Sequence, residues 1–453
     1  MITSQINHVL SPDTQVTLLL CAGFGQKRTI EPRPLTLTEY NNLARWLQSN
    51  DLTPKDLLDP TIQDKLSRIT ISKLDSHRIL ALLKRGAMLS LAVEKWTSQG
   101  LWILARGDTE YPKRLKQKLK HQAPAILYGI GDKELLSKGG LAIVGSRNID
   151  DAGLEYTQRI AQTCAEQNIQ VISGGARGVD RVSMLSASET DGTAIGVMAD
   201  SLAKAAVFKQ YRTEIQQGKL TLISAYDPNA SFSVGNAMGR NKYIYALSDY
   251  ALVVDSTVNK GGTWAGATEA LSKMADVPIL VRTEENRTQG NCKLIEKGAI
   301  PFPDPPWNVP LTVSIANRIL TYKQHQKSQE SIVQNSLLDY IDTSTSQKAS
   351  LEFDVQQKNQ SFTSNNKSIN NDDDSRIHIQ DNPQNIYEAV LPLILQKLET
   401  PKNDRLLAES LEVQLGQMRA WLKKALSEGK IKKNQRPVTY EINRNKKLLL
   451  SGK

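Results

Sequence analysis

The sequence is poor in the residues that metal, disulfide and histidine-based sites require. It has five histidines, and none lies within residues 139–300, so this part of the chain offers no histidine base and no histidine metal ligand. The three cysteines, Cys21, Cys164 and Cys292, are far apart and form no CxxC pair. Their spacing argues against a disulfide framework or a zinc site, and it fits a reducing cytoplasm.

Motifs for several common ligands are also absent. There is no GxxxxGKS/T phosphate loop, and the glycine-rich stretch SGGARG does not fit the GxGxxG pattern of dinucleotide-binding folds. No apolar run approaches the roughly 18 residues of a membrane span. The N-terminus lacks the basic and apolar regions of a signal peptide. We therefore expect a cytoplasmic protein with no cofactor, no bound metal and no membrane partner.

What the chain does have is an excess of positive charge. Its 453 residues carry 57 Lys and Arg against 47 Asp and Glu, which gives a formal net charge of +10. A basic balance favours polyanionic partners such as nucleic acid or an acidic membrane, although a basic protein without such a partner has the same composition. The length suits two or three domains.

Three of the four regions of the chain are distinguished by their composition and periodicity. Residues 1–100 have helical periodicity, and we expect a helical N-terminal domain. Residues 306–383 are rich in Ser, Thr, Asn and Gln, which predicts a disordered polar linker. Residues 384–453 suggest three helices and then a strand at 436–442, a pattern typical of a winged-helix domain. Such a basic domain binds DNA or protein, and the sequence leaves both open.

The fourth region, residues 101–305, alternates short apolar runs with amphipathic helical stretches. Runs such as LAIVG (141–145), IQVIS (169–173) and YALVV (250–254) show no polar alternation, which indicates strands buried on both faces. Such strands, separated by helices, are typical of a parallel sheet with helices on both sides. The sequence therefore predicts an α/β fold with a Rossmann-like doubly wound parallel sheet.

Four segments of this region carry glycines, hydroxyls and cations: GSRN (145–148), SGGARGVD (173–180), GRNK (239–242) and NKGGTWAG (259–266). Three of them follow strands, and the fourth is expected just before a helix. Ligands of open parallel sheets bind outside the carboxyl ends of the strands, so we expect these segments at one edge. Glycine N–H groups, helix N-termini and guanidinium groups suit phosphate oxygens. The predicted anion-binding residues are Ser146, Arg147, Ser173, Gly174, Arg177, Arg240, Asn241, Lys242, Gly262 and Thr263.

No catalytic residue is predicted. Asp180 and Asp255 are possible acids, but Asp180 is more simply a charge at a helix N-terminus or part of an internal ion pair near Arg177. Glu269 is expected to be a solvated or structural carboxylate. Without a histidine base in this region, we expect a binding protein and not an enzyme.

Taken in order, these segments resemble the DprA/Smf family of bacterial DNA-processing proteins. LAIVGSRNIDDAG (141–153) is similar to the family's GSR motif, and VISGGARGVD (171–180) to its SGxARGxD motif. The later matches are GRNKYIYALSDYALVVDS (239–256) to the RNR segment and its strand, KGGTWAGATEAL (260–271) to the SGS-TA loop, and QGNCKLIEKGA (289–299) to the closing GxNxLIxxGA.

The resemblance implies a protein that binds single-stranded DNA, protects incoming DNA and loads the recombinase RecA during natural transformation or recombination. It also implies a homodimer formed through the Rossmann-like domain. Carried over by position, it places Arg147, Arg177, Arg240 and Lys242 at the pocket that binds the DNA backbone.

The chain departs from the family pattern at several positions. Ser183–Met184 stands where the family usually has Ala-His, and Ala237–Met238 stands where it has Phe-Pro. Lys242 stands at the third position of RNR in place of arginine, and Gly261–Gly262 replaces Ser-Gly.

Two other functions stay open on the sequence alone. The fold superfamily also resembles cytokinin-activating phosphoribohydrolases, whose PGGxGTxxE loop is partly matched by KGGTWAGATEA (260–270). The alternative is therefore a nucleotide-binding or nucleotide-hydrolysing enzyme or sensor. The remaining possibility is a DNA-binding regulator that acts mainly through residues 384–453.

Overall fold

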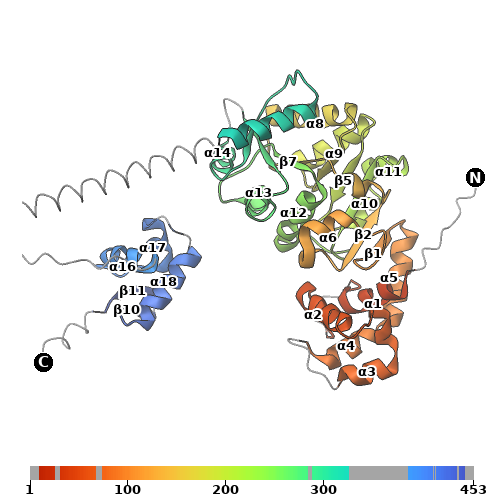
Figure 1. Ribbon diagram of the computed structural model, residues 1–453, viewed down its shortest axis with the longest axis horizontal. Coiled ribbons are helices and arrows are strands. Elements are labelled where there is room, and N and C mark those ends of the chain that lie inside the picture. The colour runs from red at the N-terminus through yellow and green to blue at the C-terminus, as the bar shows by residue number, and fades with distance from the viewer. Residues whose placement is uncertain are drawn as a thin grey trace, which may run out of the picture. The chain divides into compact units, whose positions relative to one another are not determined.

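The computed structural model describes residues 10–25, 31–67, 74–283, 288–325, 386–411, 413, 415–435 and 438–443. The chain divides into two compact units, Met1–Ser350 and Leu351–Lys453. The first unit contains a nine-stranded sheet with many helices, and the second contains helices and a two-stranded sheet (Figure 1).

The nine-stranded sheet is the centre of the first unit. Its strands are β1 (Trp102–Ala105), β2 (Ile126–Ile130), β3 (Leu141–Val144), β4 (Val171–Ser173), β5 (Ala194–Val197), β6 (Leu220–Ser224), β7 (Tyr250–Val253), β8 (Ile279–Thr283) and β9 (Ile300–Pro303). They are ordered β1-β2-β6-β5-β4-β3-β7-β8-β9. All strands from β6 to β9 along this order are parallel, and β2 runs antiparallel to both of its neighbours, β6 and β1. The predicted α/β fold with a large, mostly parallel sheet is confirmed.

Helices cover both faces of this sheet. They are α6 (Lys113–Leu119), η2 (Lys120–Gln122), α7 (Leu135–Lys138), α8 (Asp151–Glu166), α9 (Val179–Glu189), α10 (Leu202–Ala206), α11 (Lys209–Gln216), α12 (Val234–Leu247), α13 (Gly261–Lys273) and α14 (Gln289–Glu296). In β3, Leu141 and Ile143 pack with α8 to α11, whereas Ala142 and Val144 pack with α6, α7 and α12 to α14. Burial on both faces explains why the strand sequences lack polar alternation.

The direction of strand addition reverses between β3 and β7, which are neighbours in the sheet. Strands β4 to β6 are added on one side of β3, and β8 and β9 are added beyond β7. The loops that follow β3, β4, β7 and β8 emerge at the same edge because these strands are parallel. A crevice at such a reversal is the usual ligand-binding place of an open α/β sheet.

The described residues before β1 form helices. These are α1 (Pro12–Cys21), α2 (Leu37–Gln48), η1 (Pro54–Leu58), α3 (Pro60–Ser67), α4 (Ser76–Leu83) and α5 (Gly86–Ser98). A capping box starts α2, since Glu39 N–H donates to the Thr36 hydroxyl and Thr36 N–H donates to the Glu39 carboxylate at 2.7 Å. Leu43 and Leu47 lie in a core of these helices, but Trp96 packs into the sheet core.

The polar linker was predicted to start at residue 306, and this boundary is wrong. Residues 311–325 are helical. Leu311 and Ile315 are 0% and 1% exposed and belong to the core on the α8 side of the sheet. Gln167 accepts a hydrogen bond from the Leu311 N–H at 2.7 Å. The rest of the predicted linker, 326–383, lies outside the described residues.

The second unit has its own apolar core. Its helices are α16 (Ile386–Lys397), α17 (Asp404–Ser410) and α18 (Leu415–Ser427), and its strands are β10 (Ile431–Gln435) and β11 (Val438–Ile442). The two strands pair antiparallel, with Ile431 opposite Ile442. Met418 and Trp421 of α18 pack with Leu407 of α17 and Tyr440 of β11. The predicted helices and the strand near 436–442 are present, and β10 is an additional strand.

Strand β9 forms one edge of the large sheet and contains two prolines. Pro301 lies opposite Val281 of β8, and Pro303 lies opposite Thr283. Proline has no N–H group, so it stays in a ladder only where that position faces away from the neighbouring strand. The outer side of β9 therefore lacks two backbone donors.

Candidate nucleic-acid interface

A cavity of about 620 Å³, here called the basic cavity, opens at the carboxyl edge of the sheet. Its walls come from the loop after β3 (145–148), the start of α9, one side of α12 and the first turn of α13. Its volume falls within the roughly 300–1,000 Å³ of small-ligand sites. The predicted gathering of these segments at one edge is confirmed.

Arg147 is an exposed cation that lines this cavity. Its guanidinium carbon lies 5.2 Å from the ring centroid of Phe232, which is 51% exposed. A guanidinium placed over an aromatic ring is attracted to the ring face, while its N–H groups stay free to bind phosphate oxygens. The exposed ring offers a surface on which a base can stack.

Arg240, in contrast, is buried below the cavity and is 5% exposed. Its Nη1 donates a hydrogen bond to the Val197 carbonyl at 2.7 Å, and its Nη2 lies 3.9 Å from the buried Asp180 carboxylate. Burial raises the pKa of Asp180 and lowers that of Arg240, and the attraction between the two groups opposes both shifts. The ion pair expected near Arg177 therefore forms with Arg240.

One donor of this arginine is left over. Arg240 Nε is buried and has no hydrogen-bond partner among the described residues. A buried donor without a partner is costly unless a ligand or water satisfies it. Other atoms of Arg240 line the cavity, whereas Nε itself is shielded from solvent.

Gly174 lets the buried pair fit beneath the loop after β4. A β-carbon at this position would collide with the Arg240 guanidinium and the Asp180 carboxylate. That carboxylate also accepts hydrogen bonds from the backbones of Gly145 and Ala176. The glycine is therefore required by packing at the base of the cavity.

Two predicted residues hold the neighbouring loops together. Thr263 donates its hydroxyl hydrogen to the Gly145 carbonyl at 2.8 Å, which joins the start of α13 to the end of β3. Asn241 Nδ2 donates to the Gly262 carbonyl at 2.8 Å, which joins α12 to α13. Both bonds fix the shape of the cavity wall.

Two predicted serines have different surroundings. Ser173 is fully buried and donates to the Ile143 carbonyl at 2.6 Å, so its hydroxyl stays within the sheet. Ser146 lines the cavity, and its hydroxyl bonds to the backbone of Asn148 at 3.0 Å. Of the two, Ser146 is the one placed to meet a ligand.

Arg177 and Lys242 are not among the residues that line the cavity. Arg177 is exposed and donates a hydrogen bond to the Asn148 side chain, which lines the cavity. Lys242 is half-buried, with its ammonium 5.3 Å from the ring centroid of Tyr243. Burial lowers the pKa of Lys242, and the nearby Glu269 opposes this shift.

Arg240, Asn241 and Lys242 were predicted just before a helix, which is wrong because they lie inside α12. The helix begins after Ser233, whose hydroxyl accepts a hydrogen bond from the Asn236 N–H at 3.0 Å. Residues two apart do not share a helix face, so Lys242 points away from the side on which Arg240 lies.

Sequence reasoning missed the apolar part of the cavity wall. Val234 and Met238 line the cavity beside Phe232 and are 65% and 43% exposed. The departure from the family pattern at Met238 thus falls on the cavity, whereas Met184 is fully buried in the core. Phe232 precedes α12, and Val234 and Met238 lie on its exposed first turns, so none of them belongs to a buried periodic pattern that would have identified it.

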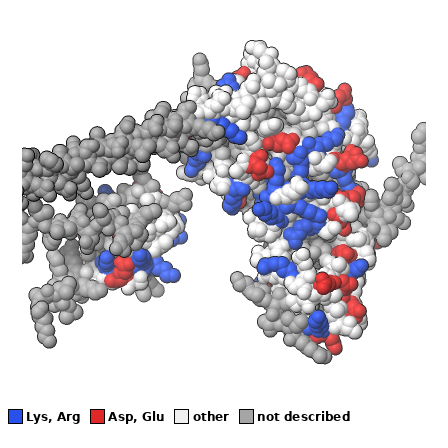
Figure 2. All heavy atoms as spheres, viewed as in Figure 1, with Lys and Arg blue, Asp and Glu red and all other residues white. Residues whose placement is uncertain are grey.

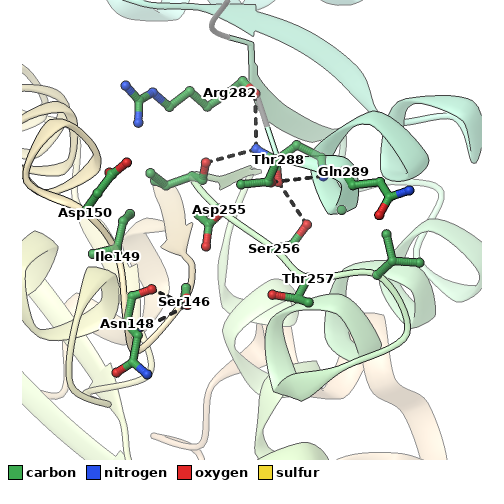
Figure 3. A pocket seen from close by; sticks show the side chains of 14 residues that line it. Ser146, Asn148, Ile149, Asp150, Asp255, Ser256, Thr257, Arg282, Thr288 and Gln289 are labelled. Atoms are coloured by element: carbon green, nitrogen blue, oxygen red, sulfur yellow. Dashed lines mark hydrogen bonds between the residues drawn. The ribbon is translucent and has the colours of Figure 1, made fainter. Parts of the chain in front are cut away.

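A second cavity of about 480 Å³ adjoins the first and shares Ser146, Asn148, Ser256 and Thr257 with it. Figure 3 shows that Asp255 lies between Thr257 on one side and the loop that contains Ser146 on the other. The polar lining includes carboxylates, so this cavity is less suited to phosphate than the basic cavity.

Asn291 fixes the wall of the second cavity. Its Nδ2 donates to the carbonyls of Val254 and Arg282 at 3.0 and 3.2 Å, and its Oδ1 accepts from the Ser256 hydroxyl at 2.9 Å (Figure 3). The Arg282 guanidinium bonds to Asp304 at 3.1 Å outside this network.

Comparison with known proteins identifies the family that the sheet-containing domain resembles. A family model described as DNA recombination-mediator protein A matches residues 102–305. The chain is 27% identical to the DNA processing protein DprA of Bacillus subtilis over 207 residues, and 28% identical to Protein Smf of Escherichia coli over 235 residues. Residues 102–305 form a DprA/Smf family domain.

The DprA/Smf match covers part of each sequence. It spans 45% of this chain and 69% of the Bacillus subtilis protein, and 51% of this chain and 61% of the Escherichia coli protein. The solved structure of DNA processing protein A from Streptococcus pneumoniae has 19% sequence identity and a TM-score of 0.50, over 65% of this chain and 95% of that one. It shares the fold.

Within the part of the chain that the structure describes, no group of three or more His, Cys, Asp or Glu side chains could hold a metal ion. The described helices include none that is long and apolar enough to cross a membrane. Neither finding adds a ligand to the basic cavity.

Proposed function

We propose that this DprA/Smf protein binds single-stranded DNA at the basic cavity and acts in DNA processing during recombination or natural transformation. The observation that carries the proposal is the pairing of exposed Arg147 with exposed Phe232 at the cavity. Phosphate would bind to the guanidinium and to N–H groups of the glycine-rich loops, and a base would stack on the ring. Stacking of this kind is worth about 1–3 kcal/mol per base.

The first prediction concerns the charge of Arg147. Arg147→Ala should weaken binding of oligo-dT and make the slope of log affinity against log salt shallower by about 0.7, the value for one phosphate contact on a single strand. Fluorescence anisotropy across a salt titration measures both quantities.

Arg181→Ala is a matched control. Arg181 lies 5.1 Å from the ring centroid of the exposed Phe208, which is the same kind of pair, and neither residue lines the basic cavity. If the two variants lose the same affinity, or if neither loses any, Arg147 is not the phosphate contact.

The proposed function includes a handover of the bound strand to RecA by a homodimer. Family membership supports this role. RecA filament formation on DNA coated with single-strand-binding protein, with and without this chain, would test the handover. Light scattering after size exclusion would test the dimer, and a monomeric mass would rule it out.

The helices and strands of the second unit support the proposal that residues 384–453 are a winged-helix domain. Such a domain would bind either DNA or another protein. Basic β10 contains Lys432 and Lys433, which are exposed. Gel shifts with single- and double-stranded DNA, with and without residues 384–453, would separate the two uses. If deletion of residues 384–453 abolished all DNA binding, the chain would be a DNA-binding regulator that acts through this domain. The basic cavity would then not be the DNA-binding site.

The rival function, nucleotide hydrolysis, needs a general base at the cavity. Asp180, the acid that lines it, is buried and lies beside Arg240. Its surroundings suit a structural carboxylate better than a base that exchanges protons with substrate. The test is to incubate the protein with a nucleoside monophosphate and to look for free base by chromatography. Release of the base would support the nucleotide-hydrolase hypothesis.

A further inference from the structure

Helix α6 carries an unusual concentration of positive charge for its length. Its sequence KRLKQKL is followed by Lys120, so five of eight residues are cationic and none is acidic. Figure 2 shows Lys and Arg side chains gathered over the region where Figure 1 places α6 and α12. Lys113 and Lys120 are exposed, and Lys116 is half-buried.

Two of the five cations have structural partners. Arg114 donates to the Asp249 carboxylate at 2.7 Å. Lys118 donates to the Ser248 carbonyl at 2.6 Å and lies 3.6 Å from Asp276. These bonds attach α6 to the loop between α12 and β7, so the helix is held in one position.

The other three cations, Lys113, Lys116 and Lys120, pair with no carboxylate among the described residues. Lys116 lies 5.4 Å from the ring centroid of Tyr111, and this ring is its described contact. Other lysines of the same unit do have acidic partners: Lys133 with Glu110, Lys219 with Asp191, Lys273 with Glu269 and Lys293 with Glu296. On α6, in contrast, three lysines without a described carboxylate partner lie within eight residues.

Helix α12 connects this surface to the basic cavity. One side of α12 lines the cavity with Ala237, Met238 and Asn241, and α12 also packs against α6. A strand that leaves the cavity along α12 would meet the lysines of α6.

The side chains of α6 fit a polyanion better than a membrane or a protein. Its two leucines, Leu115 and Leu119, are 0% and 5% exposed and face the core. A helix that binds a membrane surface presents an apolar face to the lipid, and a protein interface has an apolar centre. The exposed part of α6 has neither, and it offers only cations and an amide.

We propose that Lys113, Lys116 and Lys120 form a second phosphate-contacting surface for the same single strand, beyond the nucleotides held in the basic cavity. This inference rests on the proposed function, because it requires the strand to enter at that cavity. It makes affinity depend on strand length: a short strand occupies the cavity alone, and a longer one also reaches α6.

The test compares dT6 and dT30 with the full chain and with a triple variant, Lys113→Ala, Lys116→Ala and Lys120→Ala. The variant should bind dT30 more weakly, with a salt slope shallower by about 2, the value for three contacts at roughly 0.7 each. Its affinity for dT6 should be unchanged. The matching Lys→Gln triple variant, which keeps side-chain length, should behave in the same way.

A second triple variant controls for total charge. Lys55, Lys84 and Lys95 are exposed lysines of the N-terminal helices, and Lys55→Ala with Lys84→Ala and Lys95→Ala should leave dT30 binding intact. Equal losses in both triple variants, an equal loss for both oligonucleotide lengths, or no loss would overturn the inference. Failure of the proposed function is distinguishable, because then the unaltered chain binds neither oligonucleotide or Arg147→Ala has no effect.

Discussion

Arg147 and Arg240 show how two arginines of similar sequence context acquire different roles. Both occur in short segments with glycine and asparagine, and both were predicted to bind DNA. The structure leaves Arg147 exposed over Phe232 but surrounds Arg240 with Val197 and Asp180. Spacing in the sequence predicted that the two segments meet at one edge of the sheet, and both arginines line the same cavity, whereas the partner of each side chain depends on contacts between distant segments.

At the same scale, Gly174→Ala should destabilise the fold. The added β-carbon would collide with Arg240 and Asp180, and overpacking of a filled site costs roughly 1–3 kcal/mol. Urea denaturation followed by fluorescence measures the change in the free energy of unfolding.

Gly235→Ala is the control for that substitution. Gly235 lies in the first turn of α12 and has open space around it, so alanine there should be neutral or stabilising by about 0.4–1 kcal/mol. Equal effects of the two substitutions would show that the Gly174 site can relax.

At the scale of elements, the strands were easier to predict than the helix boundaries. Apolar runs such as 141–145 and 250–254 became central strands because burial on both faces permits only apolar side chains. The start of α12 was missed because Gly235 and Gly239 break its helical pattern. The 311–325 helix was missed because its burial depends on the sheet core, which no local pattern reports.

A prediction at this scale concerns the attachment of α14. Asn291 is 2% exposed and bonds to the ends of both β7 and β8. Asn291→Ala would leave the Val254 and Arg282 carbonyls without this donor and should lower the free energy of unfolding by about 1–3 kcal/mol.

Thermal unfolding of Asn291→Ala beside Gln289→Ala provides the measurement. Gln289 is exposed on the same helix, so its substitution should change the melting temperature little. If the two variants have the same melting temperature, the hydrogen bonds of Asn291 do not stabilise the protein.

At the scale of the whole molecule, the sequence predicted the class of sheet but not the shape of the cavity. Alternating strands and helices indicated the parallel sheet, and the reversal between β3 and β7 brings the glycine-rich loops together. The cavity wall also needs Phe232 and Val234, whose position depends on how the segment before α12 folds over the loop that carries Arg147.

The end of the first unit yields a prediction about the whole chain. A protein ending at residue 305 should be less stable than one ending at 325, because it loses the buried side chains of Leu311 and Ile315. Burial of a leucine or isoleucine contributes about 1.5–3 kcal/mol, so the two together suggest a loss of roughly 3–6 kcal/mol.

Urea denaturation of both truncated chains, beside full-length Leu311→Ala, would check this expectation. The substituted chain should lie between the two truncated forms. Equal stability of the chains ending at 305 and 325 would restore the predicted boundary at residue 306.

The two prolines of β9 constrain how two copies of this protein can meet. Pro301 and Pro303 remove donors from the outer side of that edge strand, so a strand from another molecule would find an incomplete ladder there. Sheets of two copies are therefore not expected to join into one continuous sheet through β9. A homodimer of this chain is therefore expected to use a surface other than β9, and the same prolines protect β9 against edge-to-edge aggregation.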